Sequence, residues 1–354
     1  MRRVEVALAE RSYTITIASG LLDRAGELLE PYARNGRIVA VSDENVWSAQ
    51  GGRLLASGLD IVPVLVPPGE GSKSWAQLQA LTERLLELGV ERSDSILAFG
   101  GGMVGDLAGF AASILKRGCA CVQVPTSLLA QVDSSVGGKT AINAAAGKNL
   151  IGTFHQPAAV LIDPSTLDTL PHRELRAGYA EVVKYGLIGD PDFFEWCEAN
   201  VADLLAGDEA ARLHAIETSV RAKAAIVAED ETETTGRRAI LNFGHTFGHA
   251  FESETNFAML HGEAVALGMT LAFRFSAERG LCRAEEAERV AAHLGSAWPE
   301  GISAGRLVER MALDKKASGG RVAFVLTRGI GRAFVDRSVE LGEVEAFLER
   351  ELGR

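Results

Sequence analysis

The sequence has 354 residues, of which 47% are hydrophobic, so the chain can bury a large core and form two domains. Its formal net charge of −11 argues against a broad basic surface for nucleic acid or an anionic membrane, but a local basic cluster can still hold a small anionic substrate. The 4 cysteines form no CxxC pair, and we find neither a signal peptide nor a membrane span, so we expect a cytoplasmic protein.

The first half of the chain alternates short apolar runs with helical patterns. Residues 1–20 alternate polar and apolar side chains, which predicts a strand pair. Further buried strands are predicted at residues 37–42, 60–66, 95–100, 121–125 and 159–163, and the clearest helix between them is at residues 74–89. Strands separated by helices form parallel βαβ units, which leave a nucleotide-sized crevice at the carboxyl ends of the strands.

The second half of the chain differs in composition and in the spacing of its apolar residues. Residues 172–313 are rich in Ala, Leu, Glu and Arg at helical spacing, and a strand pair at 321–336 precedes a final amphipathic helix at 339–352. We therefore predict an α/β protein with a Rossmann-like α/β domain over residues 1–170 and a mostly α-helical domain over residues 171–354. Active sites are common in the cleft between two such domains.

A glycine-rich loop follows the strand at residues 95–100. Gly100, Gly102 and Gly105 satisfy GxGxxG ahead of a helical pattern, as in loops whose backbone approaches a pyrophosphate at a helix N-terminus. The loop follows the third strand rather than the first, and no carboxylate lies about 20 residues further on. A tight turn from strand to helix is the alternative explanation of the pattern.

Polar side chains follow two other predicted strands. Asp43 and Asn45 come after the strand at residues 37–42 and can supply the missing ribose contact, while Glu70 and Lys73 follow the next strand. Such a cluster is expected where parallel strands end at a ligand crevice. Each residue alone is also typical of a turn or a helix cap.

Residues 116–157 concentrate glycine, small polar residues and positive charge. Lys139 and Lys148 occur in glycine-flanked polar segments that read as turns, and Arg117 precedes Gly118. Several glycines in one segment indicate a backbone shaped around a ligand, and lysines in such loops commonly meet phosphate or carboxylate. Ordinary solvated lysines are the alternative.

Two histidines lie four residues apart in NFGHTFGHAFE, residues 242–252. On a helix, His245 and His249 would share one face. That spacing suits two ligands of one metal ion, but it equally suits one ligand and one acid–base group, or two histidines without a metal. The spacing alone does not decide between them.

Six long segments together resemble the 3-dehydroquinate synthase family: GGGMVGDLAGF, VPTSLLAQVDSSVGGKTAIN, GKNLIGTFHQP, AEVVKYG, LNFGHTFGHAFE and LHGEAVALGM. The resemblance runs from about residue 35 to 335. It implies an NAD-binding first domain, a metal- and substrate-binding second domain, and a homodimer. Members convert 3-deoxy-D-arabino-heptulosonate 7-phosphate to 3-dehydroquinate and phosphate in the shikimate pathway. They use NAD catalytically, for transient oxidation, phosphate elimination, reduction and aldol closure, together with zinc or cobalt.

The resemblance assigns the histidines different roles. It implies that the metal ligands are Glu181, His245 and His261, a set typical of catalytic rather than structural zinc. Lys184 would share a helix face with Glu181, and His249 would act as an acid–base or phosphate-binding group, since histidine titrates near neutrality.

The remaining family positions divide into three sets, with Lys139 in both the catalytic and the cofactor set. Those implied in catalysis are Lys139, Lys184, Glu233, Arg238, Asn242 and His249. Those implied in substrate binding are Arg117, Asp133, Asn149, Lys223 and either Lys315 or Lys316. Those implied in NAD binding are Asp43, Asn45, Glu70, Lys73, Gly101, Gly102, Met103, Val104, Gly105, Asp106, Thr126, Ser127, Lys139, Lys148, Thr166, Leu167, Asp168 and Thr169.

Some positions depart from the family pattern. Pro68 stands where Asp is frequent, and Ser127 replaces a common Thr, both on the cofactor side. The segment before Arg238 is one residue longer than usual, which bears on the choice of Glu233 as the acidic residue.

Three other functions fit parts of the sequence. Another sugar-phosphate cyclase, such as an amino-dehydroquinate or epi-valiolone synthase, would share most motifs. A metal-dependent polyol dehydrogenase would share the architecture but would not need the basic residues for a doubly anionic substrate. A nucleotide-binding subunit without catalysis would not need the metal and substrate residues. We expect a small sugar-phosphate substrate and neither nucleic acid nor membrane as a partner.

Overall fold

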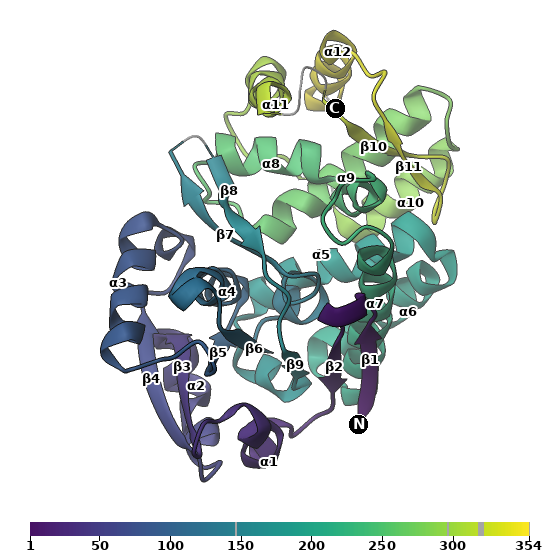
Figure 1. Cartoon of the computed structure of the whole chain (residues 1–354). Helices are drawn as coiled ribbons and strands as arrows, with labels where there is room; N and C mark the ends of the chain where they lie inside the picture. Colours follow the sequence, from purple (N-terminus) through teal and green to yellow (C-terminus); the bar gives the residue numbers. More distant parts are fainter. Residues whose placement is uncertain (146, 296, 318–321, 354) are drawn as a thin grey trace. The chain divides into compact units, whose positions relative to one another are not determined.

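The computed structural model describes residues 1–145, 147–295, 297–317 and 322–353, with the side chains of residues 314–317 excepted (Figure 1). Contacts between Cα atoms divide the chain into two compact units. Unit 1 contains Met1–Leu175 and Asp203–Thr232, and unit 2 contains Arg176–Ala202 and Glu233–Arg354. Residues 203–232, which we expected in the helical domain, thus group with the α/β unit. The functional boundary at residue 170 stays a prediction.

Unit 1 is built on a seven-stranded sheet with the order β1-β2-β9-β6-β5-β3-β4. Strand β1 pairs antiparallel with β2, and every other neighbouring pair is parallel. The apolar runs of the sequence therefore form the buried strands predicted for them. The strands are β1 (Arg2–Val6), β2 (Tyr13–Ile17), β3 (Arg37–Asp43), β4 (Asp60–Val66), β5 (Ser95–Gly100), β6 (Ala120–Pro125) and β9 (Ala159–Ile162).

The helices of unit 1 pack on this sheet through apolar stripes. In α3, Leu78, Leu81 and Leu85 recur at helical spacing and are buried, and Ser74 caps the helix by accepting a hydrogen bond from the Gln77 amide. The helices of this unit are α1 (Ala25–Leu29), α2 (Glu44–Leu55), α3 (Trp75–Glu87), α4 (Gly102–Ile114) and α7 (Glu209–Glu229). Short turns of helix are η1 (Ala9–Arg11), η2 (Leu22–Arg24), η3 (Glu30–Tyr32), η4 (Glu70–Ser72), η5 (Leu115–Arg117), η6 (Ala130–Ser134, a π-helix) and η7 (Pro164–Thr169).

The strand order explains why the glycine loop follows the third strand of the α/β region. From β3 the chain moves to the edge strand β4, then returns to β5 on the other side of β3 and continues to β6. The connections thus reverse direction between β3 and β5, which makes their carboxyl ends a topological switch point. Asp43 ends β3 and Gly100 ends β5. Asp43 and the glycine loop, which we expect to bind the cofactor, therefore lie at this crevice.

A two-stranded hairpin, β7 (Lys139–Ala144) and β8 (Gly147–Phe154), lies on α4 apart from the main sheet. The approach is close, because a Cβ at Gly109 would lie 2.5 Å from Cγ2 of Thr140. Lys139 begins β7 and Lys148 belongs to β8. Our interpretation of these two lysines as turn residues was therefore wrong: their glycine-flanked segments form a hairpin that packs on a helix.

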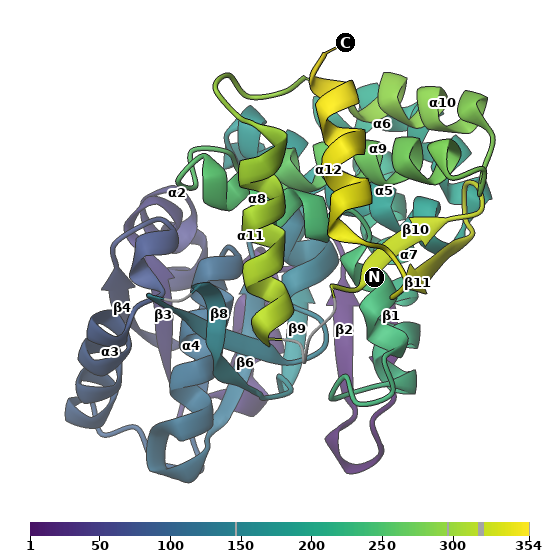
Figure 2. The ribbon, with the colours of Figure 1, turned by 90° about the horizontal axis from the view of Figure 1, so that it is seen from above.

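Unit 2 is helical around an aromatic core. Phe247, Phe275, Phe324 and Phe347 contact one another with ring centroids 5.0–6.5 Å apart. Helix α11 contacts both α8 and α12, as Figure 2 also shows. The elements are α5 (His172–Gly189, in unit 2 from Arg176), α6 (Pro191–Ala206, in unit 2 to Ala202), η8 (Arg237–Asn242), α8 (His245–Glu254), α9 (His261–Glu278), α10 (Ala284–Leu294), α11 (Ala304–Ala317), β10 (Phe324–Thr327), β11 (Ala333–Asp336) and α12 (Leu341–Leu352).

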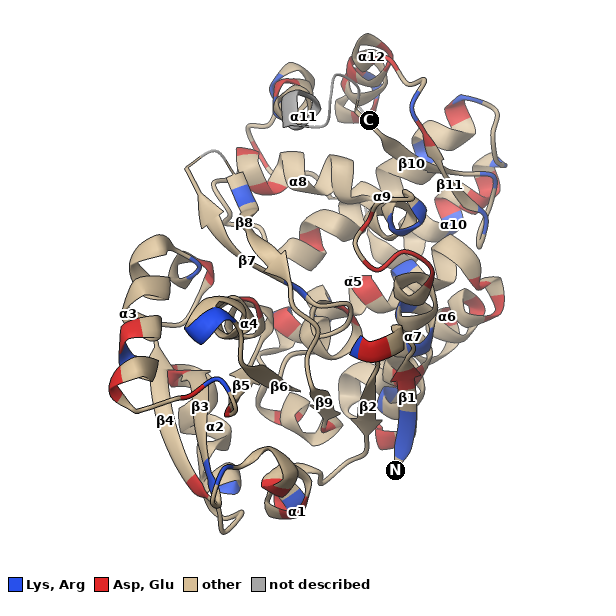
Figure 3. Ribbon diagram, in the orientation of Figure 1, with Lys and Arg blue, Asp and Glu red and all other residues tan. Residues whose placement is uncertain are grey.

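The predicted C-terminal strand pair and final helix are both present, with β10 and β11 antiparallel. Among the described residues, no helix is both long and apolar enough to cross a membrane. Figure 3 shows Lys and Arg interspersed with Asp and Glu along the helices of both units.

Candidate functional site

Three helices of unit 2 bring one carboxylate and two imidazoles together. Glu181 comes from the middle of α5, and His245 and His261 are the first residues of α8 and α9. Nε2 of His245 lies 3.5 Å, and Nε2 of His261 3.4 Å, from Oε1 of Glu181. The ligand atoms of the three side chains lie within 4.8 Å of one another, a group compact enough for a metal ion.

The outer nitrogens of both rings face acceptors. Nδ1 of His245 lies 3.2 Å from the Phe243 carbonyl oxygen, and Nδ1 of His261 lies 3.3 Å from Oε2 of Glu252. A carbonyl oxygen only accepts, so the His245 ring donates from Nδ1 and keeps Nε2 for a metal. Two such imidazoles with one carboxylate match the donor set of catalytic zinc sites, so these residues fit the expected metal.

Burial and charge act in opposite directions on the two histidines. Burial lowers the pKa of His245 to about 3, although Glu181 acts against it. Burial also disfavours the charged form of His261, but hydrogen bonds and charge from Glu181 and Glu252 outweigh it and raise the pKa to about 9. Burial thus favours the neutral form of His245, whereas the two carboxylates favour the protonated form of His261.

Lys184 lies one turn after Glu181 on α5, as the sequence predicted. Its ammonium contacts Oε2 of Glu181, and both side chains are buried, 1% and 0% exposed. A buried carboxylate is costly without a positive partner, so Lys184 offsets part of the charge of Glu181.

His249 stands at the edge of this cluster. It is exposed, and its ring centroid lies 5.4 Å from that of His245 and 6.1 Å from that of His261. His249, Glu252 and His261 form a second group compact enough for a metal ion. We favour the first group, because Glu181 faces the Nε2 atoms of two buried or half-buried histidines whereas His249 is exposed.

Other predicted residues of unit 2 lie in η8 and the segment before it. Arg238 is 1% exposed, and its Nε lies 3.4 Å from Oε1 of Glu233. Asn242 ends η8 and is exposed. Lys315 and Lys316 fall in the last turn of α11, where side chains lie outside the described residues.

In unit 1, the ammonium group of Lys73 contacts three other candidate residues. Its Nζ lies 2.6 Å from Oδ2 of Asp106 and 3.5 Å from Oε1 of Glu70, and it donates to Oδ1 of Asn149. Lys73 is 4% exposed. Burial lowers the pKa of Lys73, but Asp106 and Glu70 outweigh burial and leave the pKa above its ordinary value. The residue is therefore a buried cation at the edge of the crevice.

Asn143 completes this network and was not foreseen from the sequence. Its side chain donates to Oε1 of Glu70 and accepts from the Asn149 amide, both at 2.9 Å, and its own amide donates to the Lys73 carbonyl. It thus fastens the hairpin to the carboxyl edge of the sheet. A single asparagine in a strand carries no pattern that signals such a role.

Residues from the other strand ends lie close to the glycine loop. The Thr126 amide donates to the Gly100 carbonyl, and a Cβ at Gly101 would lie 3.3 Å from Oγ of Ser127. A Cβ at Gly102 would lie 2.9 Å from Oγ of Ser134, which places η6 at the same loop.

Two candidate substrate residues pair with each other in this part of unit 1. Although 90 residues apart in the chain, Lys223 and Asp133 form an ion pair of 3.0 Å, and Lys223 also donates to the Asp133 carbonyl. The pair joins α7 to η6. Helix α7 packs on η6 within unit 1, and this packing brings Lys223 to Asp133.

Several candidates already have structural roles. Asp43 caps α2, its Oδ1 accepting from the Asn45 and Val46 amides. Asp168 pairs with Arg212 at 2.5 Å, and Thr169 accepts from Gln50. Val104 and Leu167 are buried, 0% and 1% exposed, so only their backbone can reach a ligand.

Arg117 is separated from the glycine loop. The loop precedes α4 at the carboxyl ends of the strands, whereas Arg117 follows α4 and precedes β6, at the amino ends. Its φ of 68° is unusual for a residue other than glycine. Arg117 therefore lies at the opposite end of the sheet from the glycine loop.

Comparison with known proteins identifies relatives of both halves. Residues 63–177 match the family model for the 3-dehydroquinate synthase N-terminal domain, and residues 178–317 match the model for its C-terminal domain. A curated 3-dehydroquinate synthase from Zymomonas mobilis is 53% identical, over 99% of this chain and 96% of that protein.

Solved structures of related cyclases have the same fold. A 2-epi-5-epi-valiolone synthase from Streptomyces hygroscopicus, with NAD+ and Zn2+ bound, is 31% identical with a TM-score of 0.90, covering 98% of this chain and 99% of that one. A 2-deoxy-scyllo-inosose synthase, complexed with carbaglucose-6-phosphate, NAD+ and Co2+, is 26% identical with a TM-score of 0.86, covering 99% of each chain. The fold, with an α/β first half and a mostly helical second half, is thus shared.

Proposed function

The chain belongs to the 3-dehydroquinate synthase family, and on that basis we propose that it converts 3-deoxy-D-arabino-heptulosonate 7-phosphate to 3-dehydroquinate and phosphate. The observation that carries this proposal is the identity of 53% to a curated member over nearly the whole of both chains. The valiolone and inosose synthases, at 31% and 26%, are more distant, which favours this reaction over theirs.

Unit 1 would hold NAD at the switch point between β3 and β5. The glycine loop offers backbone amides at the N-terminus of α4, where a pyrophosphate is stabilised. Both capping bonds of Asp43 go to Oδ1, so Oδ2 can accept from a ribose hydroxyl. Glu70 and Lys73 pair with each other at this crevice and would contact the nicotinamide half of the cofactor. When bound, NAD supplies a hydride acceptor that returns the hydride later in the reaction.

Unit 2 would hold a zinc or cobalt ion on Glu181, His245 and His261. Such an ion supplies Lewis acidity, which polarises a substrate hydroxyl. His249 is exposed beside the cluster, so it can exchange a proton with substrate while remaining outside the ligand set. Lys184 and Arg238 are buried cations that would pair with the carboxylate or phosphate of the substrate.

The remaining candidates would serve the same anionic substrate. In unit 1 these are Lys139, Asn149 and the Asp133–Lys223 pair. We propose a role in substrate binding for Arg117 too. We further propose a cytoplasmic homodimer, as the family resemblance implies.

The proposal is tested by a coupled assay with the heptulosonate phosphate, NAD and zinc. The expected result is release of phosphate in step with dehydroquinate, while the total NAD+ stays constant. Accumulation of NADH with turnover would indicate a polyol dehydrogenase instead. Turnover of the amino analogue, but not of the heptulosonate phosphate, would indicate an amino-dehydroquinate synthase.

A further inference from the structure

Glu252 is a buried carboxylate that contacts an expected metal ligand from the outside. It lies on α8, seven residues after His245, and its side chain is 2% exposed. Its Oε2 lies 3.3 Å from Nδ1 of His261, while Nε2 on the other side of that ring lies 3.4 Å from Glu181. The imidazole of His261 is thus held between two carboxylates from two different helices.

We propose that Glu252 is a positioning residue for the metal site. It accepts the Nδ1 proton of His261, which fixes the tautomer and the ring orientation in which Nε2 is presented to the metal. This inference rests on the metal site of the proposed function. Carboxylates in such positions make the imidazole a stronger ligand, and their loss typically costs 10- to 100-fold in metal affinity.

His245 has a different outer partner, which makes the role of Glu252 specific. Nδ1 of His245 faces the Phe243 carbonyl, a backbone group that no substitution removes. His261, by contrast, begins α9, and its ring is 32% exposed. Its outer partner is a side chain rather than a backbone group, so a substitution at Glu252 can test this contact.

A rival arrangement places Glu252 in direct contact with the metal, together with His249 and His261. In that arrangement Nδ1 of His261 would bind the metal, and Nε2 would face Glu181. The two arrangements predict different behaviour. Replacing a metal ligand removes stoichiometric binding, whereas replacing an outer carboxylate weakens binding and keeps one metal per chain.

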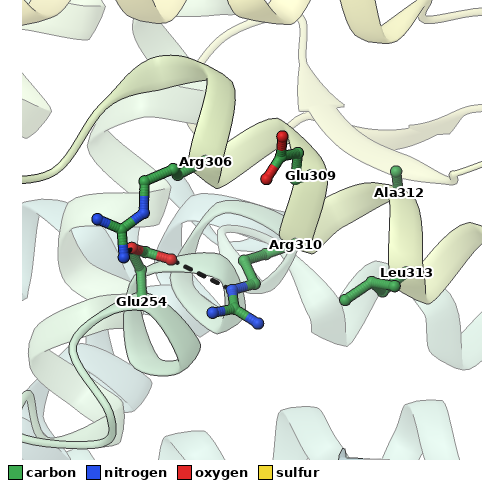
Figure 4. A pocket seen from close by; sticks show the side chains of 6 residues that line it. All are labelled: Glu254, Arg306, Glu309, Arg310, Ala312 and Leu313. Carbon is green, nitrogen blue, oxygen red and sulfur yellow. Dashed lines mark hydrogen bonds and ion pairs between the residues drawn. The ribbon is translucent and has the colours of Figure 1, made fainter.

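The same helix provides a matched control. Glu254 is also 2% exposed, but it faces α11, where Arg306 contacts its Oε1 and Nε of Arg310 lies 3.2 Å from its Oε2. Figure 4 shows these side chains lining a pocket, with Glu254 on α8 and the two arginines on α11. Glu254→Gln removes a buried carboxylate from α8 without touching His261, so it separates a loss of helix packing from a loss of metal positioning.

The experiment measures zinc affinity by competition with a chromophoric chelator, for the wild type and for Glu252→Gln, Glu254→Gln and His245→Ala. Each variant is also titrated with cobalt and its visible spectrum recorded. We expect Glu252→Gln to bind one zinc about 10- to 100-fold more weakly, with a cobalt spectrum of unchanged coordination number. Glu254→Gln should keep the wild-type affinity, and His245→Ala should bind no stoichiometric metal.

The outcomes distinguish this inference from the metal site on which it rests. A wild-type protein without stoichiometric zinc would refute the metal site itself. A wild-type protein that binds zinc, with equal affinity in Glu252→Gln, would refute the positioning role alone. Loss of stoichiometric metal in Glu252→Gln, as in His245→Ala, would make Glu252 a ligand and also overturn the proposal. Equal weakening in Glu252→Gln and Glu254→Gln would attribute the effect to packing of α8.

Discussion

Substituting Gly262 with alanine should damage the metal site through packing alone. Gly262 follows His261 in the first turn of α9, where that helix crosses α5. A Cβ at this position would lie 1.8 Å from the carbonyl oxygen of Ala177. Ala177 lies one turn before Glu181 on α5, so the alanine would force apart the two helices that carry Glu181 and His261.

The size of the displacement follows from that contact. Real Cβ atoms essentially never approach closer than 3.0 Å, so a backbone contact of 1.8 Å must open by about 1.2 Å. Metal–ligand distances tolerate about 0.2 Å. Unless Glu181 and His261 recover their positions by other movements, zinc cannot bind both. Overpacking of this kind also costs about 1–3 kcal/mol of folding stability.

The assay compares Gly262→Ala with Gly189→Ala by zinc competition and by thermal unfolding. Gly189 ends the same helix α5, is exposed, and a Cβ there would have no neighbour within 4 Å. We expect Gly189→Ala to keep full zinc affinity and a melting temperature at or above that of the wild type. A folded Gly262→Ala protein with unchanged zinc affinity would refute the argument, because it would show that α9 and α5 can separate without moving the ligands.

Three further outcomes are expected. His245→Ala should lose stoichiometric zinc by metal analysis, whereas His249→Ala should keep zinc and lose turnover; zinc retained in the His245 variant would contradict the ligand assignment. NAD should bind more tightly than NADP in calorimetry, because Asp43 accepts from a ribose hydroxyl but repels a 2′-phosphate; equal affinities would show that Asp43 only caps α2. Arg238→Ala should lower kcat/KM at least about tenfold, because a charge-assisted contact with the substrate is lost. Arg237→Ala, at the exposed neighbouring residue, should have little effect. Equal effects of the two substitutions would show that Arg238 does not bind the substrate.

Local patterns in the sequence predicted much of unit 1. Continuous apolar runs identified the parallel strands, and the strand-end position of Asp43, Glu70 and Lys73 predicted that these residues lie at one edge of the sheet. The fold confirms both. Whether the edge binds NAD stays a prediction. What the patterns missed is the order of the strands, which makes β3 and β5 neighbours and so accounts for the late glycine loop.

Long-range packing limited the prediction elsewhere. Helix α7 belongs to the Ala- and charge-rich second half of the sequence, as the helices of unit 2 do, but it packs on β1 and η6 and brings Lys223 to Asp133. The hairpin residues Lys139 and Lys148 read as turns, because glycine and small polar residues are typical of turns. Gly138 does have a positive φ of 67°, but Gly152 of β8 serves close approach, since a Cβ there would lie 2.0 Å from the Thr140 carbonyl oxygen. Only the pairing of β7 with β8 reveals that use.

Glu252 and Glu254 illustrate what the sequence alone does not predict. The two carboxylates are two residues apart on α8, are both buried, and have the same chemistry. Residues at i and i+2 on a helix point to different faces, so the pattern predicts that they differ without saying how. The difference comes from other helices, since α9 brings His261 to one carboxylate and α11 brings two arginines to the other. Residue type thus predicts that a buried carboxylate needs a partner, and only the packing of neighbouring helices decides whether that partner belongs to the metal site.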